Sequence, residues 1–285
     1  MARVAGLHRI ALRVPNLDAV ADFYKNLWGM EPVKSGGDER QFKSRGVADP
    51  DLVFRSGGKQ GLEYVALGVK SAADLDAIVA TVEKAGHKGS IVERSNREVS
   101  VRDPDGNLVK LVVAPKAGAA QKLEEPVTGP RKIGHVVLWT PQRETMEKFY
   151  ALFGLGVSDR TARGMSFMRC NADHHSVAFV DSDGRTGLQH IAFDVGTLDG
   201  VMRQKARLAE GGVECIWGLG RHGPGNNLFT YYLDPAKNCV EFYGELEQIP
   251  DASVPAEPRY WGPEHKGDRW GLAGPPPSSF TGQPH

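Results

Sequence analysis

Short apolar runs alternate with amphipathic stretches along the chain from about residue 5 to residue 247. Runs rich in branched and aromatic residues are typical of short strands, and here they read HRIALRV, EYVALGV, LVKLVV, HVVLW, HIAFDV and VEFYG. Between them lie stretches with apolar residues at three- and four-residue spacing and a closing Gly, such as SAADLDAIVATVEKAG and TLDGVMRQKARLAEGG. These predict amphipathic helices. Asn16, Ser71 and Thr197 stand at N-cap positions, each before an acidic first turn. The pattern predicts four strand–helix–strands units.

The pattern occurs twice. GLEYVALGV at 61–69 aligns with GLQHIAFDV at 187–195, and DPDGNLVK at 103–110 aligns with DPAKNCVE at 234–241, with four identities in each pair. Near the start of each copy, HRIALRV aligns with HVVLWT, and FYKNLWGM aligns with FYALFGL. The offsets are 127, 126 and 131 residues at the first strand, the 61–69 pair and the 103–110 pair. A period this constant predicts a duplicated domain.

The repeat divides the chain into an N-terminal domain at 1–113 and a C-terminal domain at 131–250. The stretch 114–130 carries little pattern and is expected to be a linker. The tail, 251–285, is rich in Pro and Gly but contains Trp261 and Trp270. We therefore expect an irregular strap on the surface instead of a third domain.

Composition narrows the functional class. The chain has 285 residues, of which 40% are hydrophobic and 25% charged, and 35 Lys and Arg balance 35 Asp and Glu. No basic surplus draws it to nucleic acid or to an acidic membrane, so neither is an expected partner. Three cysteines without a CxxC pair fit a reducing compartment. Neither an apolar leader nor a run of ~18 apolar residues occurs, so we expect a soluble, unprocessed cytoplasmic protein.

Three metal-ligand residue types occur together in the second copy only. The alignment sets His135 against His8, His190 against Tyr64 and Glu241 against Lys110. Three neighbouring strands would present them on one face of a curved sheet. Two histidines and one carboxylate on one side of a metal are the arrangement of non-haem Fe(II) oxygenases. A lone strand histidine is more often structural, and His8 is interpreted so, because a lysine ammonium in its copy offers no lone pair.

A second polar cluster has no counterpart in the first copy. It consists of His174 and His175 in NADHHSVAF, His222 in GRHGPGNN, and Tyr231 with Tyr232 in FTYYLDP. Alone, adjacent histidines would indicate a solvated turn, and GRHGPG a flexible loop. Beside the metal-ligand set they favour a site in an ordered loop. Because adjacent side chains of an extended chain point to opposite faces, only one of the two histidines can reach the metal.

The ordered motifs GHVVL, NxxHH, LQHIAFDV, GRHGPGNN and YxxDPxxNxVEFYGE in the C-terminal half carry a resemblance. Over residues 5–247 the chain resembles two-domain type I extradiol ring-cleaving dioxygenases of the vicinal oxygen chelate superfamily. The resemblance implies an α+β fold of two tandem domains, each of two βαβββ units forming a half-open mixed β-barrel. It implies His135, His190 and Glu241 as metal ligands and His175 as the acid–base residue. His222 and Tyr231 match residues that line the substrate and oxygen pocket.

The implied activity is cleavage of a catechol-type ring with O₂, both oxygen atoms entering the product, in aromatic compound catabolism. The implied metal is Fe(II), with Mn(II) the alternative that the same ligands accept. A homo-oligomer is expected. Some relatives carry an Asp after the loop histidine, where this chain has Gly225 and Asn226.

Two rivals share the fold: a glyoxalase-type metal isomerase or lyase, and a metal-free small-molecule binding protein. The isomerase would not need the group of His175, His222 and Tyr231, and the binding protein would not need the metal ligands. Variable positions such as Met165, Phe167 and Trp217 are expected to form the pocket wall and to set the ring substituent, which the sequence leaves open.

Overall fold

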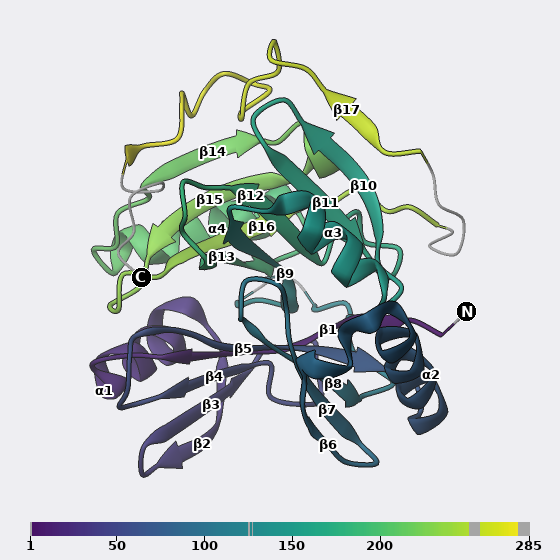
Figure 1. Cartoon of the computed structure of the whole chain (residues 1–285). Helices are drawn as coiled ribbons and strands as arrows, with labels where there is room; N and C mark the ends of the chain where they lie inside the picture. Colours follow the sequence, from purple (N-terminus) through teal and green to yellow (C-terminus); the bar gives the residue numbers. More distant parts are fainter. Residues whose placement is uncertain (1, 125, 127, 251–256, 279–285) are drawn as a thin grey trace.

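The computed structural model describes residues 2–124, 126, 128–250 and 257–278. Two curved mixed sheets lie one above the other, with the N-terminal half of the chain below and the C-terminal half above in Figure 1. Positions 125 and 127 of the predicted linker, and 251–256 and 279–285 of the predicted tail, lie outside the described residues.

The N-terminal sheet has eight strands in the order β2-β3-β4-β1-β5-β8-β7-β6. The strands are β1 (Val4–Arg13), β2 (Glu31–Gly36), β3 (Glu39–Lys43), β4 (Leu52–Arg55), β5 (Gly61–Val69), β6 (Ile91–Arg94), β7 (Glu98–Arg102) and β8 (Leu108–Val113). The helical segments are α1 (Leu17–Asp22), the π-helical η1 (Phe23–Trp28), α2 (Ala72–Val82), η2 (Glu83–His87) and η3 (Lys88–Ser90).

The C-terminal sheet has nine strands in the order β14-β15-β16-β13-β9-β12-β11-β10-β17. The strands are β9 (Lys132–Thr140), β10 (Gly156–Thr161), β11 (Met165–Arg169), β12 (Val177–Asp181), β13 (Gly187–Asp194), β14 (Trp217–Arg221), β15 (Leu228–Leu233), β16 (Cys239–Gly244) and β17 (Arg259–Trp261). The helical segments are α3 (Arg143–Ala151), α4 (Leu198–Glu210) and η4 (Pro224–Asn226).

Each half is built from two βαβββ units, as the resemblance implies. In each sheet the first strands of its two units pair antiparallel at the centre, β1 with β5 and β9 with β13. All three predicted N-caps are confirmed: the side chains of Asn16, Ser71 and Thr197 accept from backbone N–H groups of the first helical turn at 3.0–3.1 Å. These bonds satisfy donors that a helix start leaves without an intrahelical partner.

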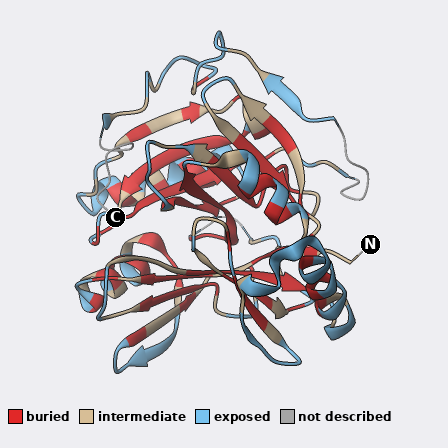
Figure 2. Cartoon of the chain, in the orientation of Figure 1, coloured by how far each residue is buried: buried red, intermediate tan, exposed pale blue. Residues whose placement is uncertain are grey.

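Aromatic side chains join the two halves into one core. Trp28 at the end of η1 and Phe242 on β16 are both 0% exposed, and their rings stack with centroids 3.7 Å apart. Phe193 of β13 meets the edge of Trp28 at 5.3 Å. In Figure 2 the buried colour is concentrated in the central strands of both sheets. The two domains therefore bury apolar surface against each other.

The described part of the tail, residues 257–278, crosses the outside of the upper sheet as the yellow trace in Figure 1. We call it the strap. It begins with β17, which extends the C-terminal sheet by pairing parallel with β10. Within the strap, part of a tail that was expected to be irregular, these three residues form a short strand. Among the described residues, no helix is long and apolar enough to cross a membrane.

Candidate metal centre

The three predicted metal ligands come from three adjacent strands. His135 lies on β9, His190 on β13 and Glu241 on β16, and β13 is the middle strand of the three. Ala192 pairs with His135 on one side and with Glu241 on the other. Alternation along β13 then turns His190 to the same face, because side chains two residues apart share a face. The prediction that one face receives all three is confirmed.

The ligand atoms converge. Nε2 of His135 and Nε2 of His190 each lie 3.2 Å from Oε2 of Glu241. The three side chains each offer one ligand atom, and these atoms lie within 4.8 Å of one another. Within the part of the chain that the structure describes, this is the one group of three or more His, Cys, Asp or Glu side chains so arranged.

The buried polar atoms fit a cation. Oε2 of Glu241 is buried and accepts no hydrogen bond from any described residue, although two imidazole nitrogens lie beside it. Burial raises the pKa of Glu241, but the neighbouring imidazoles of His135 and His190 outweigh it, so the pKa falls below its usual range. Burial lowers the pKa of His190 to about 4 against the effect of Glu241. A carboxylate between neutral imidazoles is a donor set for a divalent metal such as Fe(II) or Mn(II).

Three further residues, which the sequence analysis did not identify, contact the side chains of the cluster on the sides away from its centre. Nδ2 of Asn227 donates to Oε1 of Glu241 at 3.2 Å. Oε1 of Gln189 contacts Nδ1 of His190. The ring of Tyr243 lies 5.1 Å from that of His135. Such contacts orient metal ligands, since they hold the atoms that do not face the metal. The double Asn of GRHGPGNN was the one available signal for Asn227.

His175 lies beside the ligand cluster, in the segment between β11 and β12. Its ring centroid is 4.2 Å from that of His135, and the ring of Phe167 meets it at 5.0 Å. Burial, followed by the charges of the surrounding histidines, lowers the pKa of His175 well below its usual value. Burial therefore favours the neutral form of this ring.

His222 and Tyr231 form one hydrogen-bonded pair. Nε2 of His222 lies 3.0 Å from the hydroxyl of Tyr231, whose ring meets the edge of His190 at 5.3 Å. Burial lowers the pKa of His222 and raises that of Tyr231 well above the usual value. Both side chains therefore lie close to the ligand cluster. Tyr232 does not: it packs in the apolar core, 0% exposed.

The strap contacts the same pair from outside. The backbone carbonyl of Gly267 lies 2.8 Å from Nδ1 of His222, and Asp268 accepts the backbone N–H of Arg221 at 2.9 Å. Nε1 of Trp217 donates to the carbonyl of Gly274 at 3.2 Å. The Gly267 carbonyl can only accept, so in neutral His222 Nδ1 carries the proton and Nε2 accepts from Tyr231.

Two of the three predicted pocket-wall residues touch the site. Phe167 meets His175, and Trp217 stacks on Tyr231 with ring centroids 5.3 Å apart. Met165 on β11 packs with the apolar cluster around Phe167.

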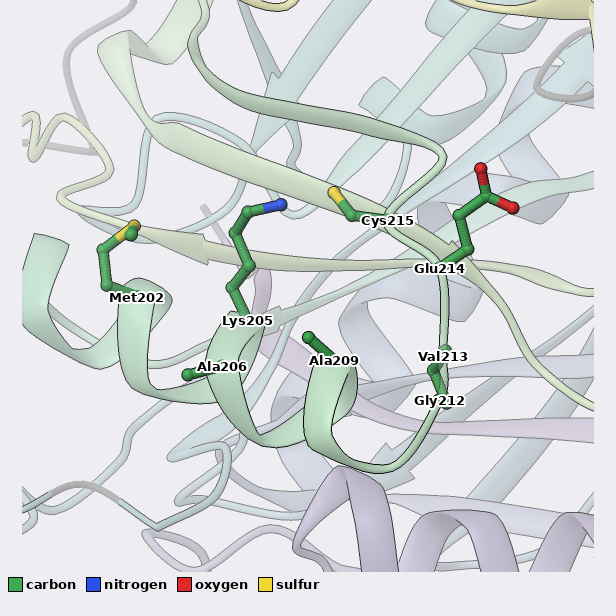
Figure 3. A pocket seen from close by; sticks show the side chains of 8 residues that line it. All are labelled: Met202, Lys205, Ala206, Ala209, Gly212, Val213, Glu214 and Cys215. Atoms are coloured by element: carbon green, nitrogen blue, oxygen red, sulfur yellow. The ribbon is translucent and has the colours of Figure 1, made fainter.

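A hollow of about 540 Å³ lies elsewhere, on the outside of α4 and the segment that follows it (Figure 3). Its lining holds Met202, Lys205 and Cys215 but none of the candidate site residues. It therefore carries no argument about the metal centre.

Among the described residues of the first domain no such cluster occurs, and the strand register of this domain corrects the alignment. Ala66 pairs with Arg9, as Ala192 pairs with His135. The counterpart of His135 is therefore Arg9, at the offset of 126 residues that also relates 61–69 to 187–195, and the alignment with His8 is wrong by one residue. Lys110 pairs with Ala66, as Glu241 pairs with Ala192. In the first domain the cationic side chains of Arg9 and Lys110 thus stand at the positions that His135 and Glu241 occupy in the second.

Family models match both halves of the chain. Residues 132–242 match the Glyoxalase/Bleomycin resistance protein/Dioxygenase superfamily, and residues 9–112 match the Glyoxalase-like domain. Metapyrocatechase 2 of Cupriavidus necator is 29% identical over 87% of this chain and 83% of its own length. Biphenyl-2,3-diol 1,2-dioxygenase of Sphingomonas paucimobilis is 27% identical over 85% and 88%. The Mn(II)-bound glyoxalase of Novosphingobium aromaticivorans is 31% identical, with a TM-score of 0.86 over 100% of this chain and 96% of that one.

Proposed function

The chain belongs to the glyoxalase/bleomycin resistance protein/dioxygenase superfamily, and we propose that it is an extradiol dioxygenase that cleaves a catechol-type ring with O₂. The convergence of His135, His190 and Glu241 on one face of the C-terminal sheet carries this proposal. Relatives named as dioxygenases of catechol-type compounds, matched over more than four fifths of the chain, support it. Breakdown of aromatic compounds is the setting that such chemistry serves.

The two histidines and the glutamate would hold Fe(II), or Mn(II) as in the glyoxalase structure. When bound, such a cation would supply Lewis acidity and would bring two reactants together at coordination positions that the protein does not fill. All three side chains are buried, so water is excluded from the part of the metal site that they surround. Glu241 contributes the one negative charge, and Asn227 holds its other oxygen in place.

We assign the movement of the proton to His175. For ring cleavage next to a catechol hydroxyl, that hydroxyl must first lose a proton. A proton must be delivered later to the oxygen atom that separates when the O–O bond breaks. His175 is the imidazole that lies against ligand His135 without being one of the converging ligands. It would accept the first proton and return it in the later step.

We assign the stabilisation of charge to the pair of Tyr231 and His222. The Tyr231 hydroxyl, which donates to Nε2 of neutral His222 at 3.0 Å, would turn this bond to the developing oxyanion in the buried setting beside His190, where it is strong because water is excluded. The strap fixes His222 through Gly267, which orients the pair before substrate arrives.

Two further features belong to this proposal. A cytoplasmic location is supported by three free cysteines, two of them buried. A homo-oligomer is supported by the exposed apolar side chains of the strap, Tyr260, Trp270 and Leu272. Neither nucleic acid nor a membrane is proposed as a partner, given the balanced charge.

The glyoxalase name of the Novosphingobium structure keeps the isomerase in view as the rival. The grouping of His175, Tyr231 and His222 around the ligands favours the dioxygenase, because an isomerase of this fold has no dioxygen chemistry for them to serve. The metal-free binding protein is disfavoured by a ligand cluster that it would not need.

The test compares substrates on Fe(II)-loaded and Mn(II)-loaded protein, prepared without air. Oxygen uptake with a yellow ring-opened product is expected with catechols and 2,3-dihydroxybiphenyl. A monophenol should give neither, because it cannot chelate two adjacent positions. Turnover of a 2-oxoaldehyde premixed with glutathione, with no oxygen uptake on any catechol, would replace the dioxygenase by the isomerase.

A further inference from the structure

Behind His175 lies a second buried pair that the metal cluster does not use. His174 and Asp159 are both 0% exposed, and Nε2 of His174 lies 3.1 Å from Oδ2 of Asp159. Nδ1 of His174 lies 3.0 Å from Nδ1 of His175. The three side chains form a line from the strand β10 to the ring that packs on His135. Although the alternation of adjacent side chains turns His174 away from the metal, His174 contacts His175 directly.

The strap holds Asp159 as a carboxylate. Nε of Arg259 donates to its Oδ1 at 2.8 Å, and Nε1 of Trp261 donates to its Oδ2 at 2.7 Å, both from β17. Burial raises the pKa of Asp159, but the neighbouring His174 and Arg259 outweigh burial and bring it below the usual value. An ionised carboxylate only accepts hydrogen bonds. Asp159 therefore requires donors from every neighbour that faces it.

The positions of the protons follow from this requirement. The nitrogen of His174 that faces Asp159 must carry a proton, so in neutral His174 the other nitrogen, Nδ1, has a lone pair. Nδ1 of His175 faces that lone pair and must then be the donor. This leaves Nε2 of His175 without a proton. The hydroxyl of Ser158 donates to the His174 carbonyl at 2.6 Å and fixes the backbone in this arrangement.

We propose that Asp159 and His174 are positioning residues that hold His175 in the form protonated on Nδ1, which keeps Nε2 available to take a substrate proton. The proposal rests on the proposed function only in giving His175 its acid–base role. The same principle orders imidazoles at metal sites, where a partner on one nitrogen fixes the tautomer and orientation of the ring. A residue that merely filled the core would not need a donor and an acceptor in this order.

The first experiment is independent of activity. Metal-free protein labelled with ¹⁵N-histidine is studied by NMR at neutral pH, and His174 and His175 are assigned by single substitution. We expect His175 protonated on Nδ1 and His174 protonated on Nε2. Asp159→Asn should convert part of the His175 population to the other tautomer. A wild-type His175 protonated on Nε2, or a tautomer that Asp159→Asn leaves unchanged, would overturn the proposal.

The second experiment uses a matched pair of substitutions. The amide oxygen of His174→Asn stands near the place of Nδ1 and can accept from His175, whereas the amide of His174→Gln reaches Asp159 and cannot. We expect kcat for a catechol to fall about tenfold to a hundredfold in His174→Gln, the usual cost of losing such a partner, and clearly less in His174→Asn. KM and metal content should stay near wild type in both.

Equal losses in the two variants, or no loss in either, would reject the positioning role. If wild-type protein cleaved no catechol, the proposed function would fail while the NMR experiment still decided the tautomer. If His174→Gln did not fold, the wild-type spectrum and Asp159→Asn would decide it alone.

Discussion

The hydroxyl of Tyr24, in the first domain, donates to Oδ2 of Asp234, in the second, at 3.2 Å. The reverse pair is also present: the hydroxyl of Tyr150 in the second domain donates to Oδ2 of Asp103 in the first, at 3.2 Å. Both tyrosines come from the repeated FY motif, and both aspartates from the repeated DP turn. Each domain therefore completes a turn of the other. The duplication made the two domains mutually dependent, because neither motif finds its partner within its own copy.

Removing these hydroxyls should weaken the joint between the domains. Tyr24→Phe and Tyr150→Phe are each expected to lower the free energy of unfolding by about 1 kcal/mol, the net contribution of one buried hydrogen bond. The effects should be similar, since both bonds have the same length and both rings are 0% exposed. Urea unfolding at constant metal content measures them. Tyr260→Phe, in a side chain 70% exposed, is the control. A loss no greater than that control would contradict the role of the crossed pairs.

The same aspartates predict a pH dependence of stability. Burial raises the pKa of Asp103 and of Asp234 to about 6, against hydrogen bonds that lower it. A carboxyl whose pKa is raised by folding binds its proton more tightly in the folded chain. Its stabilising contribution is present below the unfolded pKa of about 4 and is lost as the pH rises through about 6.

The measurement is the free energy of unfolding of the wild type minus that of the double variant Asp103→Asn/Asp234→Asn, over a range of pH. This difference should decrease between about pH 4 and about pH 7, by on the order of 2–3 kcal/mol per carboxyl. A difference that is constant or rises with pH would show that the two carboxyls are not stabilised in the protonated form.

Much of the fold of the two domains could be predicted from local sequence patterns. The repeated motifs predicted four units, and the N-caps Asn16, Ser71 and Thr197 lie where the residue types required, because a cap depends on the next three residues only. The convergence of His135, His190 and Glu241 on one face was also predictable, since alternation along a strand determines the face of a side chain. The counterpart of His135 in the first copy was not, because the shared histidine drew the alignment to His8, one residue away from the position that the strand pairing assigns.

Contacts between distant segments could not be predicted. Tyr24 and Asp234 are 210 positions apart, and Asp159 meets Trp261 across 102. Each of these residues, seen alone, is an ordinary aromatic or an ordinary aspartate. Their pairing depends on how the two sheets stack and on the path of the strap, which the local pattern does not contain.

We expect that substitution of a strap residue, which lies outside both domains, lowers the activity. Asp268 accepts the backbone N–H groups of Arg221, Trp270 and Ala273, and so closes the turn that brings the Gly267 carbonyl to His222. Asp268→Ala should therefore lower kcat for a catechol about tenfold or more, while metal content stays at the wild-type level. Steady-state kinetics of metal-loaded protein measure this. Glu264→Ala, a strap carboxylate with a side chain 68% exposed, is the matched control. Equal activity of the two variants would exclude a role of the strap in holding His222.

The last prediction concerns the asymmetry of the two domains. Equivalent positions carry His135, His190 and Glu241 in one sheet and Arg9, Tyr64 and Lys110 in the other. A lysine ammonium has no lone pair and a guanidinium repels a cation, so the first domain cannot bind a divalent metal at this place. His190→Ala or Glu241→Ala should abolish stoichiometric metal, because removing one of three ligands leaves too few donors.

The same asymmetry makes His8 the sharpest control. It occupies the bulge beside Arg9, and Leu7 and Arg9 on either side of it make the ladder pairs with β5. His8→Ala should therefore leave metal content and catechol cleavage near wild type, although it removes a histidine from the same motif as His135. Elemental analysis after dialysis against a weak chelator measures bound metal, and loading each variant with Fe(II) or Mn(II) separates ligand loss from poor loading. Retention of full metal by Glu241→Ala, or its loss in His8→Ala, would mean that the metal lies outside the three-strand cluster. The argument from the duplicated pattern depends on that outcome, because the first domain differs from the second at those positions while keeping the same sheet around them.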